Sequence, residues 1–508
     1  MSSEKLEECL GVPTERLEFR AQEETSVSDV DPPAEHAEEA IESLVDLIVS
    51  MEATSPDVVR GIRIHKLLRH APWYWWQGQL REMHQFSERV LQIDEFWSHS
   101  WRLAAWTKYL NALFLNNAWP ACVVSLVCSG IAFALFLMGC LPEWTLGPFR
   151  CSWCSFSGMA AYFLTLFLCR RRVRAFVDIA CINQKEPVKK LEGLISLGAI
   201  LKKSKRLLVL YDSTFTTRLW CLFELGGYLY SRGTPGPASA EPEIRICPPL
   251  LGPMLLGVQA LLVLSLLLLH MGKALLQYQL VVLPCLALIA TPLAHGMRAY
   301  WRGIDAMQQQ VARFSFAKAS CDCCTRGHPG GRSCDRVILA KSITAWFGSI
   351  EAFEANVQTE VRMALVRQLT NEAFTYDRLV QAAVPLLWMQ LDVSASHSGD
   401  WTVWTRWVEL SRAATHVFAI CPSWLKLLCF VTLKLRAQNC RVPMDIVMSL
   451  VIVVLGSAIY LGCSTLEEYL VWFLIPTQPY GPVFGSVISV STFSVIALVA
   501  WRCLPEFR

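Results

Sequence analysis

The stretch that decides the fold is residues 170–230, which read RRRVRAFVDIACINQKEPVKKLEGLISLGAILKKSKRLLVLYDSTFTTRLWCLFELGGYLY. Two short aliphatic runs within it, Ala175–Ala180 and Leu207–Leu210, have the composition of buried parallel strands. Between them an apolar stripe at helical spacing follows Pro187, a residue that is favoured in the first turn of a helix. A second helix is expected from about Arg218. This order of strands and helices predicts an α/β sheet that carries its functional groups at the strand ends.

A second strand–helix unit precedes this stretch. Ile93–Trp97 has the composition of a strand, Ser98–Ser100 is expected to form a turn, and Ser100 is a suitable N-cap for an amphipathic helix. Glu243–Cys247 is a candidate fourth strand. The sequence therefore predicts an α/β domain with a parallel sheet.

The composition of the whole chain is that of a membrane protein. It has 508 residues, a mean hydropathy of +0.35, 53% hydrophobic residues and 18% charged residues. A net charge of +3 predicts no nucleic-acid partner, and the 20 cysteines form no repeating framework, so we expect mostly reduced thiols. The acidic residues Glu4, Glu7 and Glu8 argue against a secretory signal.

About six apolar segments are long enough to cross a bilayer of about 30 Å. They form three hairpins: Trp119–Leu141 with Cys151–Cys169, Leu250–Leu269 with Leu275–His295, and Met444–Leu461 with Gly481–Trp501. Basic residues follow the second, fourth and sixth segments, so the positive-inside rule places both termini and all large segments in the cytosol. The lipid bilayer is thus the first expected partner, and a membrane hairpin splits the α/β domain.

These signals divide the chain into seven regions. They are a largely disordered acidic region (1–60), a helical segment with the first strand–helix unit (61–117), the first membrane hairpin (118–169), the rest of the α/β domain (170–247), the second hairpin (248–296), a helical cytosolic region (297–443) and the third hairpin with a short tail (444–508). Within the first region, Ala37–Met51 has the spacing of a short amphipathic helix. Within the helical cytosolic region, Thr415–Ile420 is expected to form one more strand.

Three short motifs resemble Toll/interleukin-1 receptor (TIR) domains. Phe96–Arg102, FWSHSWR, resembles the first TIR strand and its loop, and Trp220–Leu225, WCLFEL, resembles the WCxxEL helix. The run from Asp178 to Gln184 is similar to the strand-end signature of fungal heterokaryon-incompatibility (HET) domains, which are related to the TIR fold. The resemblance covers Gln92–Asn116 and Arg170–Leu229. The chain as a whole resembles a group of multi-pass membrane proteins encoded in dinoflagellate genomes.

The resemblance implies a chemistry and a set of site residues. In TIR domains that cleave NAD, the glutamate of WCxxEL is catalytic, which implies Glu224 here and NAD as the substrate. A carboxylate suits this reaction because breaking the nicotinamide–ribose bond passes through an oxocarbenium-like state. By the same resemblance, the cofactor-binding residues at the ends of the first two strands are Ser98, Ser100, Arg102 and Asp178.

Each of these residues also has a purely structural interpretation. Glu224 can be a helix-surface carboxylate near Arg218, on a helix that only packs against the sheet. Asp178 can cap the turn that follows its strand. Asn183 and Gln184 can simply hydrogen-bond their own loop.

A second candidate site is a cysteine-rich loop. Thiolates and an imidazole in one glycine-containing loop are the ligands that zinc prefers, and the residues concerned are Cys321, Cys323, Cys324, His328 and Cys334. The alternatives are a reduced, loop-stabilising cluster and a palmitoylation site. Cys140, Cys151, Cys154 and Cys463 lie near the non-cytosolic ends of the expected crossings. We expect membrane-embedded thiols there, and the alternative is a disulfide between the cysteines of the first hairpin if that face is oxidising.

The sequence thus predicts a membrane-anchored TIR/HET-like signalling or assembly module that self-associates and cleaves NAD. One alternative is a non-catalytic scaffold that self-associates through its α/β domain. Another is a transporter or channel. Transporters place polar or charged residues at mid-depth in the membrane. The six expected crossings hold almost no ionisable groups, with His270 and Asp445 at their ends, which favours anchors over a conduit.

Overall fold

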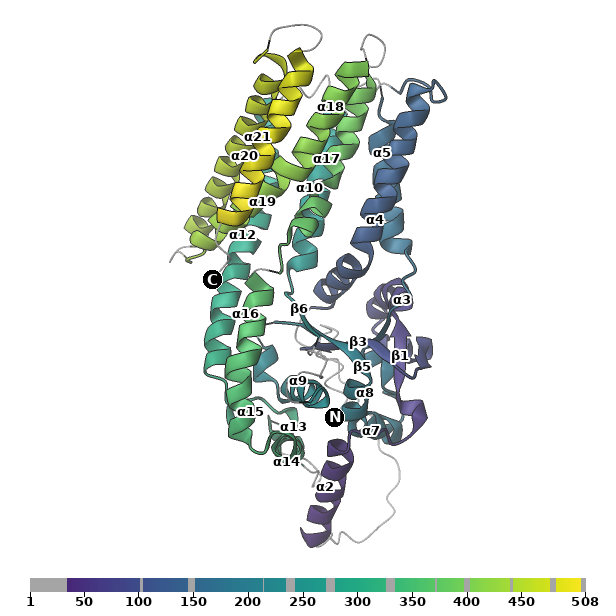
Figure 1. Cartoon of the computed structure of the whole chain (residues 1–508). Coiled ribbons are helices and arrows are strands. Elements are labelled where there is room, and N and C mark those ends of the chain that lie inside the picture. Colours follow the sequence, from purple (N-terminus) through teal and green to yellow (C-terminus); the bar gives the residue numbers. More distant parts are fainter. Residues whose placement is uncertain are drawn as a thin grey trace. The chain divides into compact units, whose positions relative to one another are not determined.

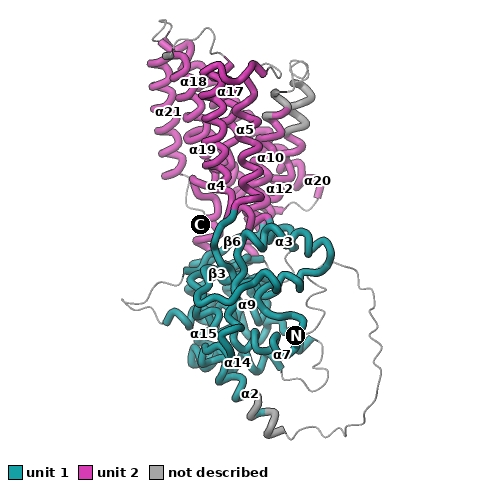
Figure 2. Tube along the Cα trace, turned by 90° about the vertical axis from the view of Figure 1, so that its right-hand side faces the viewer, with its two compact units in different colours: residues 1–109, 170–249, 307–365 teal, residues 110–169, 250–306, 366–508 magenta. Residues whose placement is uncertain are grey.

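The structure is a computed structural model of the whole chain. It describes residues 34–100, 104–144, 151–212, 214–233, 243–270, 279–325, 334–370, 372–396, 403–438, 442–475 and 481–503. The chain forms two compact units, each assembled from three separate segments (Figure 2). Unit 1 contains residues 1–109, 170–249 and 307–365, and unit 2 contains residues 110–169, 250–306 and 366–508.

Unit 1 is built around one mixed sheet of six strands (Figure 1). The strands are β1 (Arg60–Arg63), β2 (Ser87–Arg89), β3 (Ile93–His99), β4 (Arg174–Phe176), β5 (Ser204–Leu210) and β6 (Ile244–Cys247), in the spatial order β2-β1-β4-β3-β5-β6. Neighbours from β4 to β6 are parallel, whereas β1 is antiparallel to both β2 and β4. If the parallel strands β3, β4, β5 and β6 are numbered 1 to 4 in chain order, their spatial order is 2-1-3-4. The flavodoxin-like doubly wound order 2-1-3-4-5 begins in the same way.

The long apolar strands agree with the sequence, and the short polar ones do not. The strand expected at Ile93–Trp97 is confirmed as β3, and the expected fourth strand is confirmed as β6. The strand expected at Ala175–Ala180 ends at Phe176, because the backbone turns into the short helix α6 (Asp178–Cys181). Strands β1 and β2 were not predicted, since RGIR and SER have neither the length nor the alternation that marks a strand.

The core of the sheet explains why β3 lies at its centre. Ile93 and Phe96 are essentially inaccessible to solvent, and Phe96 stacks on Phe176 of β4 with ring centroids 4.8 Å apart. Burying an aromatic or aliphatic side chain of this size contributes about 1.5–3 kcal/mol. The pairing of β3 with β4 is therefore fixed by side-chain packing as well as by backbone hydrogen bonds.

Helices and short turns surround the sheet. In unit 1 they are α2 (Ala34–Val49), η1 (Pro56–Val58), α3 (Ile64–Trp76), η2 (Leu80–Phe86), α6, α7 (Pro187–Ile195), α8 (Leu197–Lys202), η3 (Phe215–Thr217), α9 (Leu219–Ser231), η4 (Phe316–Lys318), α13 (Asp322–Thr325), α14 (Asp335–Phe347), α15 (Ile350–Asn356) and η5 (Val357–Val361). The single helix expected after Pro187 is divided at Ser196, whose buried hydroxyl accepts the Thr54 N–H at 3.1 Å. A β-carbon on Gly198 would lie 2.9 Å from the Ile48 carbonyl oxygen, so glycine lets α8 approach α2.

Unit 2 is a bundle of helices. They are α4 (Ala105–Leu137), α5 (Trp153–Leu168), α10 (Leu251–His270), α12 (Gln279–Ala312), α16 (Arg362–Thr370), α17 (Tyr376–Ser396), α18 (Val403–Thr415), the π-helical η6 (His416–Ile420), α19 (Cys421–Lys434), α20 (Val442–Trp472) and α21 (Gly481–Cys503), with the first or last turns of α4, α12 and α16 belonging to unit 1. Helix α5 begins where a tertiary contact caps it. Asp392 of α17, which is fully buried, accepts the N–H groups of Cys154 and Ser155 at 2.9 and 2.8 Å. The carboxylate thus satisfies two otherwise unpaired donors at a helix N-terminus.

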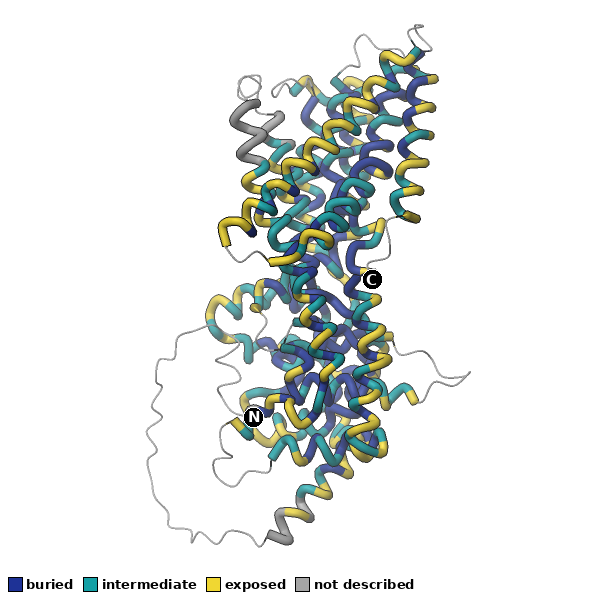
Figure 3. Tube along the Cα trace, turned by 90° about the vertical axis from the view of Figure 1, so that its left-hand side faces the viewer, coloured by how far each residue is buried: buried dark blue, intermediate teal, exposed yellow. Residues whose placement is uncertain are grey.

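Four of the described helices are long and apolar enough to cross a membrane: Ala105–Leu137, Trp404–Lys434, Val442–Trp472 and Gly481–Cys503. Three of them coincide with the first, fifth and sixth crossings expected from the sequence. Exposed positions recur along α20 and α21 (Figure 3), and many of them are apolar residues, as expected for surfaces in contact with lipid. The protein is therefore a candidate multi-pass membrane protein.

The other three expected crossings are not confirmed. Helix α5 is shorter than a span needs, and the fully described part of α10, Leu251–Ser265, does not reach that length either. The crossing expected at Leu275–His295 begins in residues 271–278, which lie outside the described residues.

The strand expected at Thr415–Ile420 is wrong. These residues form η6 in the middle of the continuous helix Trp404–Lys434. A short apolar run fits a strand or a buried helix equally well, and here the run continues α18 and leads directly into α19, so it lies within one long helix. The region 297–443, expected to be wholly cytosolic, consequently contains a candidate membrane span.

Buried charges connect the helices of unit 2. The Arg412 guanidinium forms a fork on Glu467, with Nε 3.1 Å from Oε1 and Nη2 3.0 Å from Oε2, and its Nη1 lies 3.1 Å from Glu409. Elsewhere, Arg298 Nη2 lies 2.7 Å from Asp445 Oδ1. Most of these charged groups lie outside the six crossings expected from the sequence. Val442–Trp472 is longer than the crossing expected there, and Trp404–Lys434 was not expected to cross the membrane. The statement that crossings lack ionisable groups is therefore wrong for Trp404–Lys434 and Val442–Trp472.

Candidate functional site

A pocket lies at the carboxyl ends of the parallel strands of unit 1. It is lined by residues that follow β3 and β4, by the first turns of α9 and by a segment more distant in the sequence: His99, Asp178, Ile182, Gln184, Lys190, Leu194, Leu197, Arg218, Leu219, Trp220, Cys221, Glu224 and Ser320. Strand β3 comes first in the chain. The next parallel strand, β4, pairs with one edge of β3, and the one after it, β5, pairs with the opposite edge, so the direction in which strands are added reverses at β3. This reversal is the topological switch point where open α/β sheets bind ligands.

Glu224 enters the pocket from α9, one turn after Trp220. Its carboxylate is half-buried and accepts a hydrogen bond from the Ser98 hydroxyl of β3 at 2.5 Å. Ser98 itself is fully buried and is not among the residues that line the pocket. The serine therefore positions the carboxylate from behind, which differs from the ligand-binding role expected for it.

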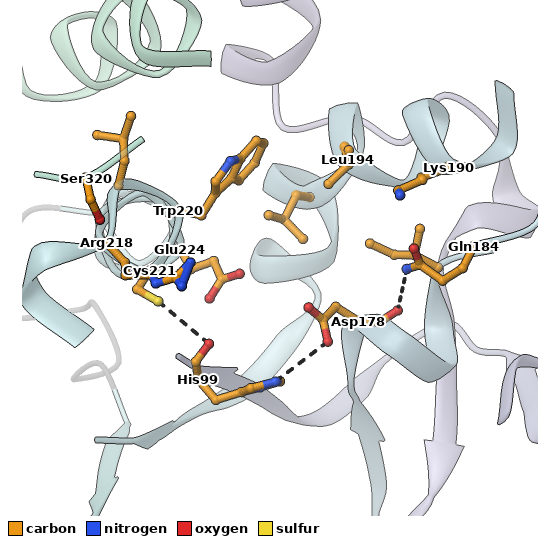
Figure 4. A pocket seen from close by; sticks show the side chains of 13 residues that line it. His99, Asp178, Gln184, Lys190, Leu194, Arg218, Trp220, Cys221, Glu224 and Ser320 are labelled. Atoms are coloured by element: carbon orange, nitrogen blue, oxygen red, sulfur yellow. Dashed lines mark hydrogen bonds and ion pairs between the residues drawn. The ribbon is translucent and has the colours of Figure 1, made fainter. Parts of the chain in front are cut away.

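Asp178 and His99 form the opposite part of the pocket. Asp178 Oδ1 lies 3.9 Å from His99 Nε2 and accepts the Ile179 N–H at 2.7 Å, so the carboxylate also satisfies one backbone donor in the first turn of α6. Figure 4 shows the carboxylates of Asp178 and Glu224 pointing into the same space from α6 and α9. The two residues singled out by different motifs of the sequence thus face one pocket.

The loop after α6 is held by its own side chains. Asn183 Oδ1 accepts the N–H groups of Lys185 and Glu186 at 2.9 and 3.2 Å. Gln184 Nε2 donates to the Asp178 carbonyl at 3.4 Å and lines the pocket as well. The contacts of Asn183 therefore match its structural interpretation. Gln184 both hydrogen-bonds its own loop and lines the pocket, so its contacts match the structural and the functional interpretation.

The remaining wall comes from a segment about one hundred residues away. Ser320 bridges to Arg218: its N–H donates to the Thr217 carbonyl at 2.6 Å, and its carbonyl accepts the Leu219 N–H at 3.3 Å. Nearby, Trp220 Nε1 donates to Asp335 Oδ2 at 3.2 Å. These contacts fasten Ser320 and Asp335 to the start of α9, where Arg218 and Trp220 face the pocket.

The other expected ligand-binding residues do not line the pocket. Ser100 is fully buried, and its hydroxyl lies 2.7 Å from the Thr214 hydroxyl, so it holds the loop that follows β5. It was also expected to cap a helix, but strand β3 continues to His99 and α4 begins at Ala105. Arg102 lies outside the described residues.

One neighbouring thiol can be assigned a packing role. Cys181 is buried under the pocket floor beside Ile182, and burial raises the pKa of its thiol to about 12. The thiol is therefore protonated at neutral pH and is not a nucleophile.

The cysteine-rich segment lies in the same unit as the pocket. The sulfur atoms of four residues expected to bind zinc converge: Cys321 Sγ is 3.0 Å from Cys323 Sγ, and Cys334 Sγ is 3.9 Å from Cys323 Sγ and 3.5 Å from Cys324 Sγ. The fifth expected ligand, His328, lies outside the described residues. In unit 2, the cysteines near the expected membrane ends, Cys140, Cys151, Cys154 and Cys463, are all free thiols, so the disulfide considered there is absent among these described residues.

The pocket offers two carboxylates, an imidazole and two cationic side chains. The cavity volume is about 40 Å³, well below the roughly 300–1,000 Å³ of typical small-molecule sites. The interior therefore admits only one small group of a ligand. The lining offers anionic groups at Asp178 and Glu224 and cationic groups at Arg218 and Lys190 to a polar ligand.

Sequence reasoning missed several lining residues. His99 is the last residue of β3, two positions beyond the strand expected at Ile93–Trp97, so a strand predicted at its full length would have marked it as a group at the carboxyl edge of the sheet. Arg218, the N-cap of α9, and Lys190, within α7, carry no local signal. Ser320 could not have been found, because only the tertiary fold brings it beside Arg218.

No known family, curated protein or solved structure matches this chain.

Proposed function

We propose that this chain is a membrane-anchored TIR/HET-like signalling or assembly module that cleaves NAD at the nicotinamide–ribose bond. The observation that carries the proposal is that Glu224 of the WCxxEL-like helix and Asp178 of the HET-like strand end line one pocket at the switch point of the sheet. A parallel-strand order that begins as 2-1-3-4 also supports it, because a flavodoxin-like order is what a TIR-like domain requires.

In this proposal Glu224 is the catalytic carboxylate. Cleavage of the nicotinamide–ribose bond leaves positive charge on the anomeric carbon, and a carboxylate held beside that carbon stabilises the charge as it develops. The Ser98 hydroxyl fixes the rotamer of Glu224 through its 2.5 Å hydrogen bond. Arg218 and Lys190 would meet the pyrophosphate. Water then completes the hydrolysis at the same carbon.

Replacing Glu224 with glutamine tests the proposal. The protein in lipid nanodiscs is incubated with NAD, and released nicotinamide is measured by chromatography. We expect turnover by the unmodified protein and a loss of roughly 10²–10⁴-fold in the variant, because glutamine keeps the size of the side chain but not its charge. Ser98→Ala should lower turnover less, since it only frees the carboxylate.

Glu186→Gln is the matched control, because Glu186 is an exposed glutamate in the neighbouring loop that lines no part of the pocket. Its turnover should equal that of the unmodified protein. Absence of nicotinamide release by the unmodified protein, at several protein densities that promote assembly, would contradict NAD cleavage. The non-catalytic scaffold would then be the better account.

A transporter or channel is the second candidate, and the buried charges in two candidate spans favour it. Glu467 and Glu409 are buried with Arg412, and His416 Nε2 lies 3.8 Å from Glu467 Oε2. Ionisable groups buried in a membrane span are costly and often mark an ion or proton path. They lie beside η6, and π-helical turns are frequent at functional sites.

Liposomes with a pH gradient test this second candidate. If the protein conducts protons, a pH-sensitive dye inside the liposomes should respond when the protein is present. Glu467→Gln should slow that response at least tenfold, because an amide does not exchange a proton at neutral pH. A response equal to that of empty liposomes, with correctly inserted protein, rules out proton transport.

A further inference from the structure

Four cysteine side chains meet at one point in unit 1. Cys321 is buried, the other three are half-buried, and all four are free thiols. The three sulfur–sulfur distances given above are 3.0, 3.5 and 3.9 Å, and the sulfur atoms of Cys321, Cys323 and Cys324 all lie within 4.8 Å of one another. Cys321, Cys323 and Cys324 are close together in the sequence, and Cys334 follows later in the chain.

Zinc binds thiolate sulfur at about 2.3 Å in a tetrahedron, which separates the sulfur atoms by about 3.8 Å. Two of the observed distances, 3.5 and 3.9 Å, are near that value, and the 3.0 Å between Cys321 and Cys323 is shorter, so binding would move these two sulfur atoms apart. A disulfide requires a bond of about 2.05 Å, and the observed distances are all longer. A shared metal ion would explain why four thiols from the region of α13 and the N-terminus of α14 converge.

We propose that Cys321, Cys323, Cys324 and Cys334 bind one zinc ion in a closed tetrahedral site. Four thiolates complete the coordination shell, so the shell needs no ligand from the loop that contains His328. A site whose four positions are all taken by protein ligands leaves none for a substrate or a reactive water. The ion is therefore structural.

The only other group of such ligands among the described residues does not compete as a metal site. It consists of Cys151, Cys154 and Asp392 in unit 2. Both carboxylate oxygens of Asp392 already accept backbone N–H groups at the start of α5. Helix capping thus explains that cluster without an ion.

The zinc site has a defined mechanical role. Its first ligand follows Ser320, which bridges to Arg218 of the pocket wall, and its last ligand precedes Asp335, which accepts from Trp220. On the far side, Arg336 donates to the carbonyls of Phe316 and Ala317 at 3.0 and 3.1 Å. The ion would therefore join the part of the chain that holds Ser320 to the part that holds Asp335, and its loss would loosen both contacts with the start of α9.

The test is the metal content of the full-length protein, purified in detergent without chelators. We expect about one zinc per chain by inductively coupled plasma mass spectrometry. Replacing the zinc with cobalt should give the intense visible absorption of tetrahedral cobalt thiolate. The double variant Cys323→Ser/Cys334→Ser should retain less than a tenth of the metal. Cys503→Ser, which changes an exposed thiol outside the cluster, should retain all of it.

The readout does not depend on enzymatic turnover, so a failed NAD assay leaves it unaffected. Full-length protein that contains no zinc and takes up neither zinc nor cobalt would overturn the proposal. So would a disulfide between any two of the four cysteines, found by mass spectrometry after alkylation of the native protein. If the double variant does not fold, the metal count and cobalt spectrum of the unmodified chain decide the question.

Discussion

Replacing Arg412 with leucine is expected to destabilise unit 2 by about 3–5 kcal/mol, the cost of leaving a buried charge without its partner. Arg412 is the cation between Glu409 and Glu467, whose side chains are 3% and 0% exposed. Leucine preserves the apolar contacts of the stem but leaves two buried carboxylates facing each other. Arg412→Lys should cost less, because lysine keeps the charge and loses only the fork that engages both oxygens of Glu467.

The measurement is the temperature at which the protein in detergent loses its monodisperse chromatographic peak. A drop on the order of 10 °C corresponds to the expected loss of stability. Arg502→Leu is the matched control, because Arg502 is exposed at the end of α21 and should change that temperature by little. Adding Glu467→Gln to Arg412→Leu should restore part of the loss. An unchanged temperature in Arg412→Leu would show that the three groups do not stabilise the bundle.

Replacing Arg298 with leucine is expected to have a similar effect, again about 3–5 kcal/mol. Arg298 is completely buried, and it donates to the carbonyls of Leu435 and Ala437 at 2.7 and 2.9 Å. It also lies beside the Asp445 carboxylate, which is 5% exposed. One guanidinium thus ties α12 to the end of α19 and to the first turn of α20. Its loss leaves a buried carboxylate and two carbonyls without this partner.

Asp305→Asn provides the comparison, since Asp305 pairs with Arg436 at 43% exposure in the same unit. Solvent screens such a pair, and its loss should cost less than about 1 kcal/mol. The double variant Arg298→Leu/Asp445→Leu should be more stable than Arg298→Leu alone, because both charges are then absent. If Asp305→Asn and Arg298→Leu lower the temperature of the same thermal measurement by equal amounts, burial does not determine how much these ion pairs stabilise the protein.

Local signals in the sequence predicted the elements that are long and apolar. Ile93–Trp97 and Leu207–Leu210 have the length and composition of strands and are strands, and Gly481–Cys503 is a candidate span because it is long and apolar enough to cross a membrane. Short or ambiguous segments were not predicted correctly, because their own residues do not determine their conformation. Strand β1 holds its conformation only because β2 and β4 pair with it, and η6 is helical because of its flanks.

The candidate site, too, was predicted only in part. The WCxxEL-like and HET-like motifs identified Glu224 and Asp178, and the structure brings both to one pocket. The roles of Ser98 and Ser100 were not predictable, because a strand residue faces a ligand or the core according to the helices that cover it. Ser98 lies behind Glu224, and Ser100 holds Thr214.

By itself, the sequence indicated a membrane protein, predicted the parallel strands and singled out Glu224 and Asp178 as candidate site residues. Hydrophobic period, segment length and motif spacing are properties of neighbouring residues, so a single chain displays them. Only the tertiary structure decided that Ser320 completes the pocket, that four cysteines converge, and that buried arginines join distant helices. These contacts connect residues up to about 150 positions apart, and no local pattern encodes which of many distant partners a side chain will meet.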